Sequence, residues 1–345
     1  MSRFAKISGA LLTVALTACS STSTSDTAVT KPNAADRTAT TVATTTTVGP
    51  KLAPVGAIGT YGVGSREKTY VDESRPTASN GSYKGAATRT LHTYTWYPSS
   101  DAKPGKDVAD GGAPDTKSGA FPLIILSHGV TGLAGVYGGT GIALASAGYV
   151  VVAPDYPLSN GAAPGGPVIT DVRNQPADAS FVLKSVIADN KTDFANIIAT
   201  QHVGAIGHSL GGFTTMGLTF AKCCADASID TAVVLAGGPF GDDLVDQSSP
   251  TPVLFFHGDA DGTVPYAMGR AAYESMKSPK AFVTIPGGAH TPPFLGSLSD
   301  LVDPYHNVLV PWFDRWLKES VNSLDGMRSA VKNSLGRMEL EESLR

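Results

Sequence analysis

The strongest chemical signal in the chain surrounds Ser209. Residues Gly207–Gly211 read Gly-His-Ser-Leu-Gly, which is a G-x-S-x-G pattern. In this pattern a tight turn from a strand into a helix lifts the serine hydroxyl above a sheet, and the glycines allow the backbone to fold back closely. An apolar strand pattern at Val203–Ile206 precedes the turn, and a helical pattern at Leu210–Ala221 follows it. This context predicts that Ser209 is a nucleophile.

A serine nucleophile needs a base that accepts its proton. After this type of turn, the acid and then the histidine follow the serine along the chain. Two histidines, His290 and His306, lie beyond the segment His257–Pro265 that follows the strand pattern Pro252–Phe256. His290 follows a strand in the glycine-rich segment Pro286–His290, whereas His306 lies near the start of a helix, where we expect a solvated or capping side chain. We therefore assign the base to His290.

Two carboxylates compete for the role of the acid that orients the histidine. The strand pattern Pro252–Phe256 runs into His-Gly-Asp-Ala-Asp-Gly, which contains Asp259 and Asp261. Asp259 is closer to the strand and fits an Asx turn with local backbone amides. Asp261 lies further into the loop, beside Gly262, where its side chain can turn back towards the loop of His290. We assign the acid to Asp261, and Asp259 remains the alternative.

The negative charge that develops on a carbonyl oxygen during attack needs two backbone amides as hydrogen-bond donors. The amide of Leu210 follows the nucleophile at a helix N-terminus, where the helix dipole also favours an anion. The second donor is expected from the segment Ser127–Gly132, which directly follows an apolar strand and carries a His-Gly pair. We assign this donor to the amide of Val130.

Strand and helix patterns alternate along the chain, and this alternation predicts a mostly parallel sheet of about eight strands with helices on both faces. The further strand patterns are Glu67–Val71, Thr90–Tyr97, Phe121–Ser127, Tyr149–Ala153, Thr231–Ala236 and Ala281–Ile285. The further helix patterns are Gly141–Ala147, Pro176–Ala188, Tyr266–Met276 and Tyr305–Lys318, in the last of which Pro311 is expected to kink or split the helix.

The sequence leaves no room for a large lid domain. Only fifteen residues separate Ala236 from Pro252, and most of them are small or acidic. The loop from Pro154 to Asn174 is rich in Gly and Pro and is expected to form one wall of an open cleft, with Tyr156 in that wall. An open cleft favours short-chain or accessible esters over long-chain triglycerides.

The segments SHGVTG, GHSLGG, HGDADGTVP and GGAH, in this order, resemble the α/β-hydrolase superfamily. Residues Tyr61–Gly64, Arg89–Leu91 and Trp96–Pro98 are similar to dienelactone-hydrolase-like and platelet-activating-factor-acetylhydrolase-like esterases, and cutinase-type polyester hydrolases are similar too. The resemblance covers about Val55–Lys318 and implies the α/β-hydrolase fold and a serine carboxylic-ester hydrolase. Dienelactone hydrolases use a Cys nucleophile, so Ser209 does not imply their activity.

The first 18 residues predict a signal peptide. Arg3 and Lys6 precede twelve mostly apolar residues, Ile7–Ala18, a stretch too short to span a bilayer. The segment Leu16–Cys19 resembles the lipobox of bacterial lipoproteins, in which the cysteine is lipidated and becomes the mature N-terminus. The resemblance implies export and anchoring to a membrane through Cys19, at the cell surface or in the periplasm. An ordinary signal peptide with a chance cysteine is the alternative.

Residues 19–54 are rich in Ser, Thr, Ala and Val without an apolar period, which predicts a disordered tether. Residues 55–320 form the predicted catalytic domain, and residues 321–345 are a tail that looks amphipathic. The adjacent cysteines Cys223 and Cys224 either form a disulfide with each other or pack as two thiols, and no metal-ligand spacing accompanies them. The net charge of −4, without a basic cluster, excludes a nucleic-acid partner.

The sequence therefore predicts an exported serine hydrolase that acts on small-molecule or polymeric esters without a cofactor. A lipase-like or cutinase-like polyester hydrolase with the same three residues remains open. So does a different class, a catalytically idle surface-binding lipoprotein on a hydrolase scaffold. The presence of Ser209, Asp261 and His290 together argues against an idle scaffold.

Overall fold

The computed structural model describes residues 51–344 apart from 106–107, 242–244, 292–293, 296–301 and 335. The strands are β1 (Val63–Asp72), β2 (Arg89–Pro98), β3 (Ala109–Asp110), β4 (Phe121–Ser127), β5 (Val150–Pro154), β6 (Ile198–His208), β7 (Ile229–Leu235), β8 (Val253–Gly258), β9 (Lys280–Ile285) and β10 (Glu339–Ser343). The helices are α1 (Gly138–Ser146), α2 (Gln175–Ala188), α3 (Asn190–Asp193), α4 (Leu210–Phe220), α5 (Tyr266–Ser275), α6 (Val302–Leu317) and α7 (Ser323–Asn333), with the 3-10 turns η1 (Ala134–Tyr137) and η2 (Ile169–Arg173).

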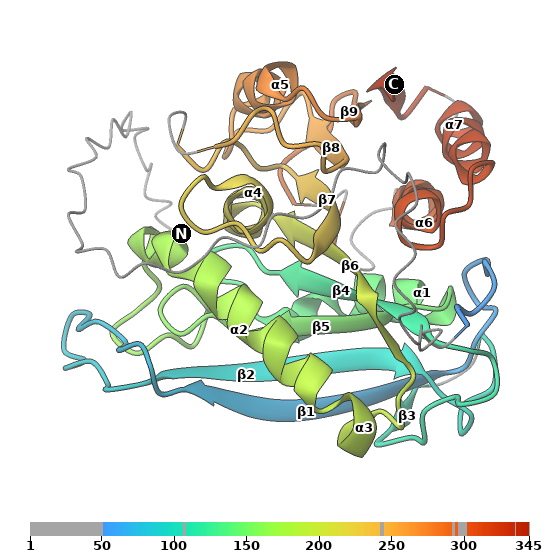
Figure 1. Ribbon diagram of the computed structural model, residues 1–345. Helices are drawn as coiled ribbons and strands as arrows, with labels where there is room; N and C mark the ends of the chain where they lie inside the picture. The colour runs from blue at the N-terminus through green and yellow to red at the C-terminus, as the bar shows by residue number, and fades with distance from the viewer. Residues whose placement is uncertain are drawn as a thin grey trace, which may run out of the picture. The chain divides into compact units, whose positions relative to one another are not determined.

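These strands form one mixed sheet in the order β10-β9-β8-β7-β6-β4-β5-β2-β1-β3 (Figure 1). The six strands from β5 to β9 in this order are parallel, whereas β2 pairs antiparallel with β5 and with β1. The result is the α/β-hydrolase arrangement that the alternation of patterns predicted. The carboxyl ends of the parallel strands meet at one edge of the sheet, which is where open α/β sheets place their ligands.

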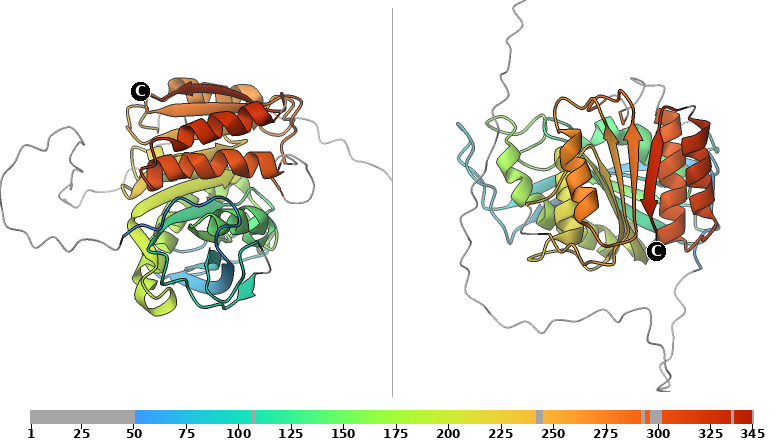
Figure 2. Two further views of the ribbon diagram at one scale, coloured as in Figure 1. Left: turned by 90° about the vertical axis from the view of Figure 1, so that its right-hand side faces the viewer. Right: turned by 90° about the horizontal axis from the view of Figure 1, so that it is seen from above.

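The sheet is buried on both faces because its central strands are apolar at almost every position. All seven residues of β4 are buried, and alternate side chains pack on opposite faces. Ile124 and Leu126 join the core beneath α1 and α6, whereas Leu123 and Ile125 join the core beneath α2. Figure 2 shows the sheet between two helical layers, with α6 and α7 on the face opposite α5.

The sequence analysis missed the strands β3 and β10. It also left open the structure of the tail 321–345, which contains α7 and β10. β3 is a two-residue strand, and β10 pairs antiparallel with β9 after α7. The sheet thus has ten strands among the described residues, not about eight. Pro311 does not split its helix, because α6 runs without a break from Val302 to Leu317. The alternative expectation, a kink at Pro311, stays a prediction. Among the described residues, no helix is both long and apolar enough to cross a membrane.

The start of the fold lies slightly before Val55. The Leu52 backbone forms a bridge with Ala120, and Ala53 is buried there, so the chain already packs on the sheet within the predicted tether. Residues 19–50 of that tether, Cys19 among them, and the predicted signal peptide lie outside the described residues.

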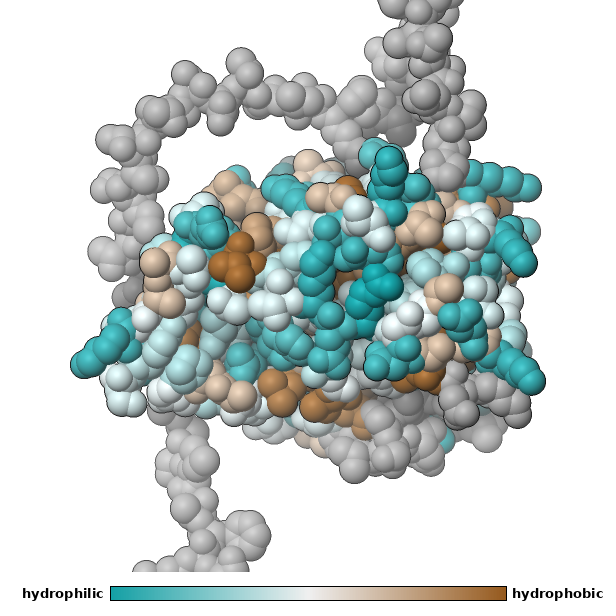
Figure 3. Space-filling model, turned by 90° about the horizontal axis from the view of Figure 1, so that it is seen from below, coloured by the Kyte–Doolittle hydropathy of each residue, from teal (hydrophilic) through white to brown (hydrophobic). Residues whose placement is uncertain are grey.

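The edge next to β3 is polar. Arg66, Glu67 and Lys68 follow one another on β1, which pairs with β3 only at Gly64 and Ser65. Figure 3 shows that the face seen from this side is mostly hydrophilic. Charged side chains on an exposed edge strand discourage pairing with another chain.

A buried ion-pair network connects this antiparallel part of the sheet to η2 and α2. Arg89, at the start of β2, is 1% exposed and bonds Asp171 in η2 and Asp178 in α2, with closest distances of 2.8 and 2.6 Å. Arg75 adds a second ion pair to Asp178, at 2.7 Å. Burial raises the pKa of Asp178, and the two guanidinium groups oppose that shift. The network fixes the end of the Pro154–Asn174 loop against the sheet.

We predict that Arg89→Met lowers the free energy of unfolding by about 3–5 kcal/mol, because it leaves two carboxylates buried without their main cation. Arg328→Met is the matched control, since Arg328 also bonds two carboxylates, Asp325 and Glu342, but on the surface. There the expected loss is at most about 1 kcal/mol. Denaturant unfolding of both variants measures the difference, and equal losses would contradict the prediction.

Candidate active site

Ser209 lies on the sharp turn between β6 and α4, as the sequence predicted. Its backbone has φ 56° and ψ −121°, a strained conformation for a residue with a side chain. Such a conformation costs about 1–3 kcal/mol and persists only where the surrounding structure enforces it. The turn places the serine at the carboxyl edge of the sheet.

The two flanking glycines are required by close backbone contacts. A Cβ atom on Gly207 would lie 2.1 Å from the carbonyl oxygen of Gly211, and a Cβ atom on Gly211 would lie 2.0 Å from that of Ser127. No side chain fits at either position. The same contacts press the start of α4 against the end of β4, which brings Ser209 beside the loop that follows β4.

The three residues predicted to cooperate form one continuous chain of hydrogen bonds. The distance from His290 Nε2 to Ser209 Oγ is 2.8 Å, and that from His290 Nδ1 to Asp261 Oδ2 is 2.7 Å. The serine follows β6, the aspartate follows β8 and the histidine follows β9. The three side chains therefore come from the carboxyl ends of β6, β8 and β9, with β7 lying between β6 and β8. Their order of hydrogen bonds is that of a Ser-His-Asp triad.

Asp261 accepts hydrogen bonds from backbone amides as well as from His290. Its Oδ1 accepts hydrogen bonds from the amides of Thr263 and Val264, at 2.8 and 2.9 Å. Burial alone raises the pKa of a carboxyl group, but the hydrogen bonds from His290 and from these amides outweigh it and hold the pKa of Asp261 below its usual value. The carboxylate thus stays ionised and fixed in orientation.

The Asx turn expected at Asp259 is therefore made by Asp261 instead. Asp259 Oδ1 accepts a hydrogen bond of 2.6 Å from the amide of Gly287, in the loop that leads to His290. The sequence could not reveal this partner because it comes from the next strand's loop. Both carboxylates consequently act on the histidine loop, one on the imidazole and the other on the backbone before it.

His306 and Tyr156 do not lie where the sequence placed them. His306 is buried between α6 and α1, and its Nε2 lies 3.1 Å from Thr140 Oγ1, so the expected solvated role is wrong. Tyr156 is fully buried, and its hydroxyl lies 2.7 Å from Ser127 Oγ, so it supports the sheet edge and lines no open cleft. Each residue is covered by an element distant in sequence, which local patterns do not show.

The loop after β4 lies against Ser209. A Cβ atom on Gly129 would lie 3.1 Å from that of Ser209. The amides of Gly129 and Thr131 bond Tyr137 Oη and the Ser159 carbonyl, at 3.1 and 2.8 Å. Between them, the Val130 amide has no acceptor within the described part of the chain.

The other predicted donor is the Leu210 amide. It lies in the first turn of α4, where amides have no acceptor within the helix. The arrangement can therefore offer both the Val130 and the Leu210 amide to an anionic oxygen.

Two further buried histidines surround the site and were missed by the sequence analysis. His208 precedes the serine, and its Nε2 lies 3.0 Å from the carbonyl oxygen of His290. His257 lies at the end of β8, and its Nε2 is 3.2 Å from Asp261 Oδ2. Burial lowers the pKa of both imidazoles, so both are neutral near pH 7. The sequence signal that could have found them is their position, His208 in the Gly-His-Ser segment and His257 in the His-Gly-Asp segment.

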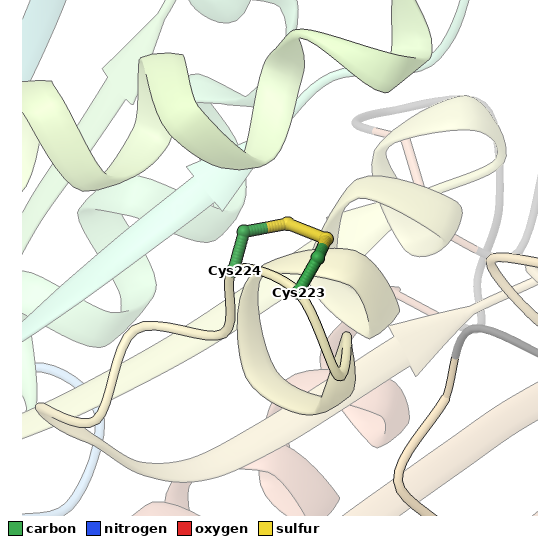
Figure 4. Close-up of a disulfide and its surroundings, with 2 residues drawn as sticks. All are labelled: Cys223 and Cys224. Atoms are coloured by element: carbon green, nitrogen blue, oxygen red, sulfur yellow. A yellow bond between two sulfur atoms is a disulfide. The ribbon is translucent and has the colours of Figure 1, made fainter. Parts of the chain in front are cut away.

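No cluster of three or more His, Cys, Asp or Glu side chains that could hold a metal ion occurs among residues the structure describes. Cys223 and Cys224 are joined in a disulfide (Figure 4). They follow the C-terminal end of α4, whereas Ser209 precedes its N-terminal end. The pair therefore lies about 16 Å or more from the nucleophile, the length of such a helix.

Known proteins are similar to this chain in family and in fold. The family described as "PETase: PET hydrolase-like" matches residues 110–330, a range that contains Ser209, Asp261 and His290. A solved ferulic acid esterase from Streptomyces cinnamoneus superposes with a TM-score of 0.58 at 22% identity, over 75% of this chain and 91% of that one. At this identity the likeness establishes the fold. No curated protein matches the chain. The family match spans more than half of the sequence, and the chain therefore belongs to the PET hydrolase-like family and is an ester hydrolase with the α/β-hydrolase fold.

Proposed function

We propose that the protein cleaves carboxylic esters through an acyl-enzyme on Ser209. The observation that carries the proposal is the unbroken hydrogen-bond chain from Ser209 Oγ through His290 to Asp261, with distances of 2.8 and 2.7 Å. A serine hydroxyl so placed can lose its proton to Nε2 as it attacks a carbonyl carbon. A catalytically idle scaffold would need neither this hydrogen-bond chain nor the strained backbone of Ser209.

The proposed reaction proceeds in two acyl-transfer steps. His290 accepts the proton of Ser209, and Asp261 stabilises the imidazolium that forms. The amides of Val130 and Leu210 donate to the oxyanion of the tetrahedral intermediate, aided by the dipole of α4. His290 then protonates the leaving alcohol, and a water molecule activated by the same imidazole releases the acid.

A polyester is the second candidate substrate class. The family match supports it, because the family is described by the hydrolysis of PET. The structural neighbour acts on an ester of ferulic acid, so accessible aromatic esters fit the same fold. A panel of p-nitrophenyl esters from acetate to palmitate, beside an amorphous PET film, ranks these substrates.

For localisation we propose export and a lipid anchor on Cys19. The Leu-Thr-Ala-Cys segment after an apolar stretch and the Thr-rich segment before the catalytic domain support this proposal. In this arrangement the tether lets the domain reach substrate at a distance from the membrane.

We predict that Ser209→Ala lowers kcat on p-nitrophenyl butyrate by about 10⁶-fold without unfolding the protein, because the attacking oxygen is lost. An organophosphonate should label the intact protein at Ser209 alone, as mass spectrometry of its peptides would reveal. Folded wild-type protein that stays unlabelled and inactive on every ester would refute the proposed function.

We predict that Asp261→Asn lowers kcat about 10⁴-fold, because the imidazole loses its orienting charge. Asp259→Asn is the matched control: an amide oxygen can still accept the hydrogen bond from Gly287, so kcat should change less than threefold. Steady-state kinetics and melting temperatures of both variants separate catalysis from folding. Loss of activity at Asp259 with retention at Asp261 would reverse the assignment.

We predict that Cys19→Ser moves the ester hydrolase activity from the membrane fraction to the soluble exported fraction, because the thiol that would carry the lipid is absent. Fractionation of cells expressing each form, with activity assays of the fractions, measures the shift. Activity that stays on the membrane after the substitution would contradict a lipid on Cys19.

A further inference from the structure

A second chain of hydrogen bonds runs behind the nucleophile, separate from the one that contains Ser209. It begins at the amide of Gly129, which lies 3.1 Å from Tyr137 Oη. The same hydroxyl lies 2.8 Å from His208 Nδ1, and His208 Nε2 lies 3.0 Å from the carbonyl oxygen of His290. The chain thus connects the residue before Val130 to the residue that serves as the base.

Only one set of proton positions satisfies every member of this chain. The His290 carbonyl can only accept, so Nε2 of His208 carries the ring hydrogen and donates to it. Nδ1 of the neutral ring is then an acceptor, and the tyrosine hydroxyl donates to it while accepting from the Gly129 amide. This arrangement needs a neutral imidazole, and burial lowers the pKa of His208 to about 4. The chain is therefore intact at neutral pH.

The surroundings give the chain little freedom to rearrange. Tyr137 and His208 are 4% and 3% exposed, respectively. The His208 ring lies 4.9 Å from that of His290 and 5.4 Å from that of Phe294, measured between ring centres. A tightly packed interior transmits a displacement of one group to its neighbours. Moving either end of the chain therefore moves the other.

We propose that Tyr137 and His208 are positioning residues that hold the Val130 amide and the His290 imidazole in register with Ser209. Neither touches the reacting atoms in this assignment. Tyr137 fixes the loop that offers the oxyanion donor, and His208 fixes the backbone of the base. The inference rests on the proposed function. It adds that one hydrogen-bond chain positions both the loop that carries the Val130 amide and the base His290.

Tyr137→Phe tests the proposal because it removes only the hydroxyl. Tyr97→Phe is the matched control, since Tyr97 is also buried and its hydroxyl donates a hydrogen bond of 2.7 Å, to the Gly112 carbonyl, outside the site. Both variants should lose similar thermal stability. Only Tyr137→Phe should lower kcat on p-nitrophenyl butyrate, by about 10- to 100-fold with KM within twofold, as a misplaced catalytic group does.

His208→Gln and the double variant with Tyr137→Phe complete the test. His208→Gln should lower kcat to a similar degree, and the double variant should be no worse than the poorer single one, because both substitutions break the same chain. If Tyr137→Phe does not fold, the kcat of His208→Gln alone decides.

Three outcomes would overturn the positioning role. They are a kcat for Tyr137→Phe equal to that of Tyr97→Phe, an unchanged kcat for His208→Gln, and losses that multiply in the double variant. If the wild type is nevertheless active and is labelled at Ser209 by the organophosphonate, the proposed function still holds in each of these cases. An inactive and unlabelled wild type would instead remove the proposed function and the positioning role with it.

Discussion

The close approach of backbones around Ser209 is the constraint on which the site depends. The start of α4 lies so near the end of β4 that only hydrogen fits on the α-carbon of Gly211. This contact forces the serine into a backbone conformation that a free chain avoids. It also sets Ser209 beside the loop after β4. The proposed nucleophile and the loop with the proposed oxyanion donor are thus brought together by one close contact between α4 and β4.

Several polar side chains near this contact each hold a different part of the loops at the carboxyl edge. Asp261 orients the imidazole, Asp259 bonds the backbone at Gly287, and His208 bonds the carbonyl of the base itself. Each loop at the carboxyl edge is short of regular structure and needs such external hydrogen bonds to keep one conformation. The network of Arg89 does the same for the loop Pro154–Asn174, at the opposite end of this loop from Tyr156.

The sequence was sufficient for the features that local chemistry dictates. Ser209 could be found because glycines at fixed spacing and a preceding apolar strand are direct requirements of the turn. The buried strands could be found because burial on both faces requires continuous apolar runs, as in β4. These features also carried the resemblance to α/β-hydrolases.

Features that depend on distant packing could not be predicted. The polar sequence Glu-Leu-Glu-Glu-Ser of β10 has almost no strand signal, and only the edge of β9 makes it a strand. His306 is buried because α1 covers it, and the partner of Asp259 comes from another loop. Pro311 keeps its helix because the apolar face of α6 is buried against the sheet, which offsets one lost backbone hydrogen bond.

The position of β10 also has a consequence for the order in which the molecule is completed. β9 leads directly to the loop of His290, yet its outer edge is paired only by a strand that follows α6 and α7 in the chain. During synthesis, the last parallel strand therefore keeps a row of open amides and carbonyls until the segment after α7 has been made. Completion of the sheet edge nearest His290 is thus a late event, and a nascent chain is most open to wrong strand pairing just before it.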